Sequence, residues 1–312
     1  MSSMILRAIL VVSIGLAACS TKPDASSAPA KAAASAVTAS PRPSFGKRRL
    51  LLAQGKAAFV NGDWDACARQ FEAAQAWLEA ARCIAHTRDL DRAFEDLQRG
   101  LAEIGPGKAV AIGALRDDPD LKALVRDPRW LAVVGDAETQ RAAYQSHQNA
   151  ELAQLARSAE PAELPPAPPR MPDAADAKLF AERVARVAEI LDGHGATTAD
   201  DYFHAALVYY RADTEDDAGR AHELALAGIE HAPDSDELKW LAAASEDRQL
   251  KHESKPQKFG TQLVMRGAHY TLWNVDPAIS DAERDRWSVA SLAEAIANAE
   301  SPGGNGETVG PL

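Results

Sequence analysis

One stretch of this 312-residue chain gathers side chains that could do chemistry, and it begins at Asp247. It holds an acid, a base, two amides, a hydroxyl and a glycine: Asp247, Arg248, Gln257, Gly260, Thr261 and Gln262. An arginine can form two parallel bonds to a carboxylate or phosphate, and a glycine lets a ligand approach the backbone closely. His204 and His222 precede the stretch, and with Asp247 they would form an acid–base set.

The same residue types also suit a purely structural task. An irregular loop packed on helices must satisfy its buried backbone groups, and aspartate, arginine, glutamine and threonine side chains do this well. We therefore favour a bracing role for Asp247 and Arg248, ahead of ligand binding and of catalysis. For His204 and His222 we favour ordinary packing between helices.

The elements around this stretch are predicted to be helical. Helical spacing of apolar residues starts at Ala177, and Thr198 with Asp201 is a capping box for the helix that carries His204. A later helix must deliver Asp247 and Arg248. The β-branched and aromatic residues of 263–275 predict a small hairpin after the loop.

A resemblance rests on three runs, 240–243 (Trp-Leu-Ala-Ala), 247–250 (Asp-Arg-Gln-Leu) and 255–262 (Lys-Pro-Gln-Lys-Phe-Gly-Thr-Gln). They resemble a bacterial domain family without an assigned activity, marked by Asp-Arg, a spacer and a Pro-Gln-x-aromatic-Gly-Thr-Gln loop. The likeness covers about residues 198–297, and Ser254 stands where a glycine is expected. It implies a helical fold and no particular reaction.

The N-terminal half carries two copies of another pattern, 62–74 and 88–101. Packing residues occupy corresponding positions in both copies, and Leu97 of the second takes the place of the aromatic Phe71: Gly55, Cys67, Phe71 and Ala74 in the first, and Ala81, Ala93, Leu97 and Gly100 in the second. The pattern resembles the tetratricopeptide repeat (TPR), although the copies are spaced more closely than its usual period of roughly 34 residues. The resemblance implies paired helices that present a surface for a protein or peptide.

Cys67 and Cys83 fall on adjacent helices of this pattern. A disulfide is one interpretation, because an exported protein meets an oxidising compartment. We favour the other, in which each cysteine is a small buried apolar residue with a free thiol.

Export is predicted by residues 1–18, in which Arg7 precedes a short apolar run. The run ends in Leu-Ala-Ala-Cys and resembles the lipoprotein box, which implies lipid on Cys19 and anchoring in the bacterial envelope. Ser20 at the next position favours the outer membrane, facing the periplasm. Residues 19–46, rich in Ala, Ser and Pro, are predicted to be a disordered tether.

The predicted class is mainly α, with a TPR-like helical domain over 47–157 and a C-terminal helical domain over 177–300. A Pro/Ala-rich linker over 158–176 separates the domains, and a disordered tail over 301–312 ends the chain. The net charge of −11 argues against nucleic acid as a partner. We expect no cofactor and no metal: the acidic residues around Asp118 lack an EF-hand pattern and suit helix capping.

Two functions remain open at this point. In the first, the chain is a lipid-anchored scaffold or binding protein that uses the helical-repeat surface for a protein or peptide partner. In the second, it is a small-ligand receptor or an enzyme with its site around Asp247 and the Gln257–Gln262 loop. No phosphate-binding loop, nucleophile elbow or zinc motif occurs in the sequence, so we favour the first, without an enzyme activity.

Overall fold

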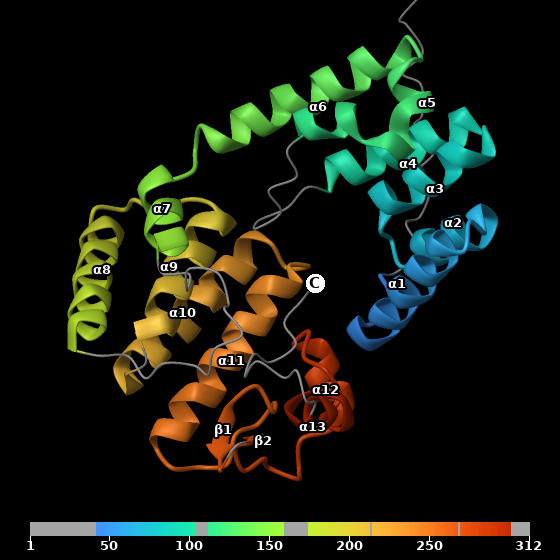
Figure 1. Cartoon of the computed structure of the whole chain (residues 1–312). Coiled ribbons are helices and arrows are strands. Elements are labelled where there is room, and N and C mark those ends of the chain that lie inside the picture. Colours follow the sequence, from blue (N-terminus) through green and yellow to red (C-terminus); the bar gives the residue numbers. More distant parts are fainter. Residues whose placement is uncertain (1–41, 104–111, 159–173, 213, 268, 301–312) are drawn as a thin grey trace, which may run out of the picture. The chain divides into compact units, whose positions relative to one another are not determined.

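A computed structural model describes residues 42–103, 112–158, 174–212, 214–267 and 269–300 (Figure 1). The described chain is mainly helical with one small antiparallel sheet, which confirms the predicted fold class. The signal segment, Cys19, most of the predicted tether, the centre of the predicted linker and the predicted tail lie outside the described residues. Within the described residues, no helix is long and apolar enough to cross a membrane.

We call the described residues 42–103 and 112–145 the repeat half. Its elements are α1 (Phe45–Val60), α2 (Trp64–Ala73), α3 (Trp77–Thr87), α4 (Leu90–Ala102), the 3-10 turns η1 (Ile112–Asp117) and η2 (Pro119–Leu121), α5 (Lys122–Val125) and α6 (Arg129–Gln145). Asp63 and Asp89 cap α2 and α4 by accepting the N–H groups of Ala66 and Arg92. α1 packs on α2, α2 on α3 and α3 on α4.

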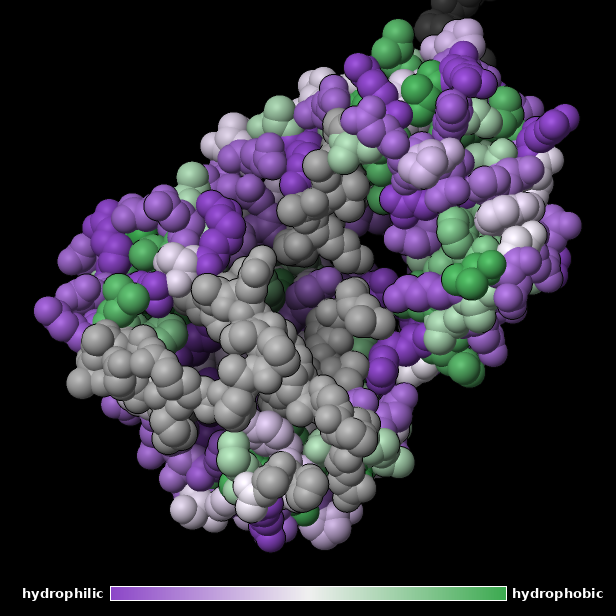
Figure 2. Space-filling model, in the orientation of Figure 1, coloured by the Kyte–Doolittle hydropathy of each residue, from purple (hydrophilic) through white to green (hydrophobic). Residues whose placement is uncertain are grey.

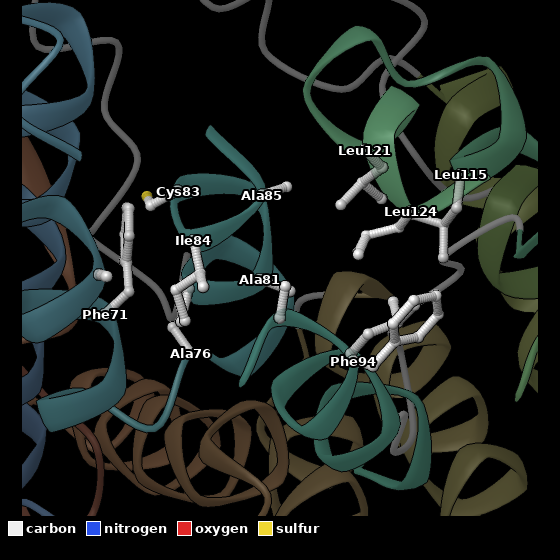
Figure 3. Close-up of a cluster of buried hydrophobic side chains, with 14 of the residues drawn as sticks. Phe71, Ala76, Ala81, Cys83, Ile84, Ala85, Phe94, Leu115, Leu121 and Leu124 are labelled. Atoms are coloured by element: carbon white, nitrogen blue, oxygen red, sulfur yellow. The ribbon is translucent and has the colours of Figure 1, made fainter. Parts of the chain in front are cut away.

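The core of the repeat half lies between these helices, and α5 with the preceding turns closes one end of it (Figure 3). The positions at which the sequence predicts small or aromatic packing residues are all buried. A Cβ on Gly100 would stand 2.7 Å from Leu78 Cγ, and a Cβ on Gly55 would stand 2.9 Å from the Phe71 ring. Both distances are too short for real contacts, so glycine is required where these helices approach each other.

Cys67 and Cys83 are joined by a disulfide, with their Cα atoms 5.9 Å apart. The interpretation that we favoured from the sequence, two free thiols, is therefore wrong. The repeat pattern places both cysteines at buried positions of adjacent helices, α2 and α3, and this brings the two sulfurs into bonding reach. Sequence spacing alone could not show that geometry.

We call residues 149–158, 174–212, 214–267 and 269–300 the C-terminal half. Its helices are α7 (Ala150–Ser158), α8 (Ala174–Asp192), α9 (Ala199–Ala212), α10 (Glu215–His231), α11 (Asp236–His252), α12 (Asp281–Arg286) and α13 (Leu292–Glu300). Thr198 and Asp201 form the predicted capping box at the start of α9, with their hydroxyl and carboxylate each accepting the other's N–H. The second core forms between α7, α8, α9, α10 and α11.

The predicted boundary between the halves is wrong. A single domain over 47–157 would place α7 with the repeats, yet Leu152 and Ala156 of α7 are buried in the second core. Asn149 caps α7 by accepting the N–H groups of Glu151 and Leu152, and its own N–H is accepted by buried Asp201. The packing of its short apolar face and this capping assign α7 to the C-terminal half. α1 also begins at Phe45, within the predicted tether.

The predicted hairpin is confirmed. β1 (Leu263–Arg266) pairs antiparallel with β2 (His269–Leu272), and Leu263 lies opposite Leu272. The Trp273 N–H donates to Gln262 O at 2.9 Å, which extends the pairing to the end of the loop that carries the candidate site. On the face shown in Figure 2, hydrophilic residues cover most of the described surface, and apolar residues form separate patches among them.

Candidate functional site

The structure brings together the six candidate residues of the stretch that begins at Asp247. Asp247 and Arg248 lie near the end of α11, and the loop from Gln257 to Gln262 returns onto that helix before entering β1. All six except Arg248 are buried, and Arg248 is half-buried. We call these six residues, together with Arg284 of α12, the Asp247 network.

Asp247 lies at its centre and is 0% exposed. Its Oδ1 accepts the Lys258 N–H at 2.7 Å and the Phe259 N–H at 3.0 Å. Its Oδ2 accepts the Thr261 N–H at 3.0 Å and the Thr261 hydroxyl at 2.9 Å. Burial raises the pKa of Asp247, and these donors oppose that rise. Both carboxylate oxygens are occupied by the loop, so neither is directed at a substrate.

Gly260 makes this arrangement possible. Its φ of +86° lies in the left-handed region, and it separates the two N–H groups of Phe259 and Thr261 that share one carboxylate. A Cβ at this position would meet no atom closer than 3.9 Å. Backbone conformation therefore requires the glycine, and the space that a ligand would need is not the reason for it.

The side-chain amide of Gln257 donates to backbone carbonyls and accepts a backbone N–H, as the backbone of a neighbouring strand does in a sheet. Its Nε2 donates to Gln262 O at 3.0 Å and to Trp273 O at 2.8 Å, while its Oε1 accepts the Gln262 N–H at 2.7 Å. Its own N–H donates to Asn274 O at 2.8 Å. The amide thus ties both ends of the loop to the segment that follows the hairpin.

Gln262 and Arg248 attach the loop to α9 and α11. Gln262 Nε2 donates to Ala244 O at 3.1 Å, and its Oε1 accepts the Arg248 Nε–H at 3.3 Å. The Arg248 guanidinium also donates to the backbone carbonyl of Tyr210 and lies 3.7 Å from the centre of the Tyr210 ring. Arg248 therefore bonds a backbone carbonyl and a side-chain amide, as a bracing residue would.

Arg284 was missed by the sequence reasoning. It is 1% exposed, and its guanidinium donates to Phe259 O at 3.1 Å, Lys258 O at 3.2 Å and Ile279 O at 2.5 Å. The peptide groups of Lys258 and Phe259 thus give their N–H groups to Asp247 and their carbonyls to Arg284. Arg284 belongs to a short helix of charged residues, a pattern typical of an exposed segment, so the sequence carries no signal for its burial.

Each of the two histidines has a partner, which lies on another helix for His222 and on the same helix for His204. His222 Nδ1 lies 2.8 Å from Ala242 O, a contact that joins α10 to α11. The His204 ring meets Phe203 edge-on, with ring centres 5.8 Å apart. Since loop donors hold both oxygens of Asp247, the acid–base set of Asp247 with a histidine, which was the less favoured interpretation, is not assembled.

Among the described residues, no group of three or more His, Cys, Asp or Glu side chains could hold a metal ion. In comparisons with known proteins, no family model matches this chain, and no curated protein or solved structure matches it either.

Proposed function

We propose that the chain is a lipid-anchored envelope protein that binds a protein or peptide partner through its repeat half. The membrane anchor rests on the lipoprotein-like box at Cys19, and the repeat half resembles a binding scaffold in its sequence pattern. The C-terminal half serves in this proposal as a rigid module without its own catalysis.

The observation that carries the proposal is an uncovered apolar stripe on α1. Leu50, Ala53, Ala57 and Val60 recur at spacings of three and four residues, so they share one face of the helix. All four are exposed, and Val60 is 84% exposed. Phe45 and Gly55 of the same helix are buried, so α1 has apolar residues on both its covered and its uncovered sides.

An exposed apolar stripe at the edge of a helical array has a physical meaning. Arrays of helix pairs need polar outer faces on their terminal helices to stay soluble, because each pair otherwise buries its face on a neighbour. α1 is the first helix of the described array, and its outer side carries this apolar stripe between the exposed polar residues Lys47, Gln54 and Lys56. A partner that lays an amphipathic helix along the stripe would bury it, which is a recurring mode of peptide recognition.

The alternative, a ligand or catalytic site at the Asp247 network, has less support. Asp247 spends its hydrogen bonds on the 257–262 loop, and Gln257 and Gln262 spend theirs on that loop and on the segments packed against it. A receptor or enzyme would keep donors or acceptors directed at its ligand.

In-cell photo-crosslinking tests the proposal. A photoreactive residue at Val60 of the full-length chain should give a discrete adduct with one partner, and Leu50→Glu in the same chain should abolish it. Leu131 on α6, at 70% exposed, is the matched control position, since it is also apolar and uncovered. Adducts of equal yield at Val60 and Leu131, unaffected by Leu50→Glu, would contradict the proposal.

The anchor is tested separately. Metabolic labelling with a fatty acid should mark the wild-type protein and not Cys19→Ala. Equal labelling of the two proteins would refute the lipid anchor at Cys19. It would not bear on the proposed binding of a partner by α1.

A further inference from the structure

Asp96 in α4 is a buried acid whose carboxylate lacks a full set of hydrogen-bond donors in the repeat half. It is 1% exposed, and only one of its oxygens has a donor: Arg99 Nη1 lies 3.2 Å from Oδ1. Its Oδ2 is buried without a hydrogen-bond partner. A buried carboxylate oxygen without a donor is costly when the group is ionised, and the cost falls when the group takes up a proton.

A second carboxylate, Glu72 of α2, lies next to Asp96. Glu72 is held by the Arg92 guanidinium through two bonds, from Nε to Oε1 at 2.8 Å and from Nη2 to Oε2 at 2.6 Å. Two neighbouring carboxylates disfavour each other's ionisation, so one of them holds a proton more tightly than usual. Both Glu72 oxygens are bonded to Arg92, whereas Asp96 Oδ2 has no donor, so Asp96 is the group placed to take the proton.

The other charges that face this pair come from α4 itself. Arg92 and Arg99 favour the ionised form of Asp96, while burial and Glu72 oppose it more strongly. Arg99 is shared with Glu95 at 3.9 Å and lies 5.1 Å from the centre of the Trp77 ring on α3. Burial first, and then Glu72, raise the pKa of Asp96 to about 7.

We propose that Asp96 and Glu72 share one proton, so that the side-chain link between α2 and α4, which these two residues form together with the Glu72–Arg92 ion pair, is tighter in mild acid than in mild base. The shared proton gives Asp96 a hydrogen bond in place of a repulsion across the joint between the two helices. The stability of the repeat half therefore depends on the pH around it.

The direction of the effect follows from linkage. Asp96 has a raised pKa only in the folded protein, so between the ordinary aspartate value of about 4 and about 7 the folded state binds more protons than the unfolded chain. The contribution of Asp96 to stability is therefore greatest at the acid end of this range. It declines as pH rises towards 7 and is flat above it.

The test compares the wild-type chain with Asp96→Asn, which keeps the shape and removes the charge. We expect the wild-type thermal midpoint to fall between about pH 5.5 and about pH 8, in the window that the raised pKa defines. Asp96→Asn should melt several degrees higher than wild type at the basic pH, with little difference at the acid pH. A variant that melts below wild type at both values would overturn the proposal.

Asp201→Asn is the matched control. Asp201 is also fully buried, but its oxygens accept N–H groups of Asn149 at 2.6 Å, Thr197 at 3.1 Å and Thr198 at 3.0 Å. Asp201→Asn should be less stable than wild type at both pH values. Its thermal midpoint should change with pH as steeply as that of wild type. A direct readout is the carboxyl-carbon resonance of Asp96 in the wild-type chain, assigned through Asp96→Asn. A titration complete below about pH 5, near the ordinary aspartate value, would refute the shared proton.

Discussion

Asp96 in the repeat half and Asp247 in the C-terminal half are both buried aspartates within helices, and they differ in what surrounds them. Asp247 receives three backbone N–H groups and a hydroxyl from a loop that follows it in sequence. Asp96 receives one arginine and faces another acid. A buried acid is thus a structural hydrogen-bond acceptor where an irregular loop supplies donors to it. Where only helices surround it, the buried acid becomes a group that binds a proton. Helices use their own N–H groups internally and have none to offer.

The same contrast extends to how each half is held together. The repeat half relies on close approach at Gly55 and Gly100 and on the disulfide between α2 and α3. The C-terminal half adds the Asp247 network, which fixes a loop with Gly260 in a left-handed conformation. Two substitutions and one chemical treatment, each directed at one half, can test this difference.

Asp247→Ala should have the largest effect. It leaves three N–H groups and a hydroxyl buried without an acceptor, and each unpaired buried group costs about 1–3 kcal/mol, so the loss should exceed about 3 kcal/mol. Denaturant melting measures the loss, and hydrogen exchange should show amides of the 257–262 loop exposed while α1–α4 stay protected. Asp216→Ala, at an exposed acid of α10, is the control. If the free energy of unfolding of Asp247→Ala lies within about 0.5 kcal/mol of wild type, Asp247 does not brace the loop.

Reduction of the disulfide should come next. Cys67 and Cys83 are 16 residues apart, and closing a loop of that size contributes about 3 kcal/mol in the chain-entropy model. Reductant should therefore lower the midpoint of the repeat half and leave the Asp247 network protected. A double variant, Cys67→Ala with Cys83→Ala, should show no response to reductant. An unchanged wild-type midpoint would restore the free-thiol interpretation.

Arg248→Ala should have the smallest of the three effects, about 1–3 kcal/mol, because it leaves the Tyr210 carbonyl and the Gln262 amide without a donor. Arg220→Ala is the control, since Arg220 is exposed on α10 and its ion-pair partner Glu223 is exposed too; the free energy of unfolding of this variant should stay within about 0.5 kcal/mol of wild type. If Arg248→Ala melts like wild type, Arg248 does not brace the loop. Ligand binding by Arg248 with Gln257 and Gln262 would then become the better interpretation.

Much of the fold was predictable because it depends on local patterns. Helical spacing, the Thr198–Asp201 capping box and the β-rich run before Val275 predicted elements that the structure contains. The boundary at residue 157 was wrong because α7 is too short for its own sequence to show which core buries Leu152. The disulfide was disfavoured because sequence spacing does not give the distance between sulfurs.

The order of the residues was enough to indicate that the chain is mainly helical, that small residues mark the helix contacts of the repeat half, and that the polar residues between Asp247 and Gln262 act as a group. The role of that group became clear from the fold. Arg284, far along the chain, takes the loop carbonyls, and neither His204 nor His222 is among the donors that occupy Asp247. Propensity and capping act over a few residues, whereas the role of a buried polar group depends on which distant donors and acceptors the fold brings to it.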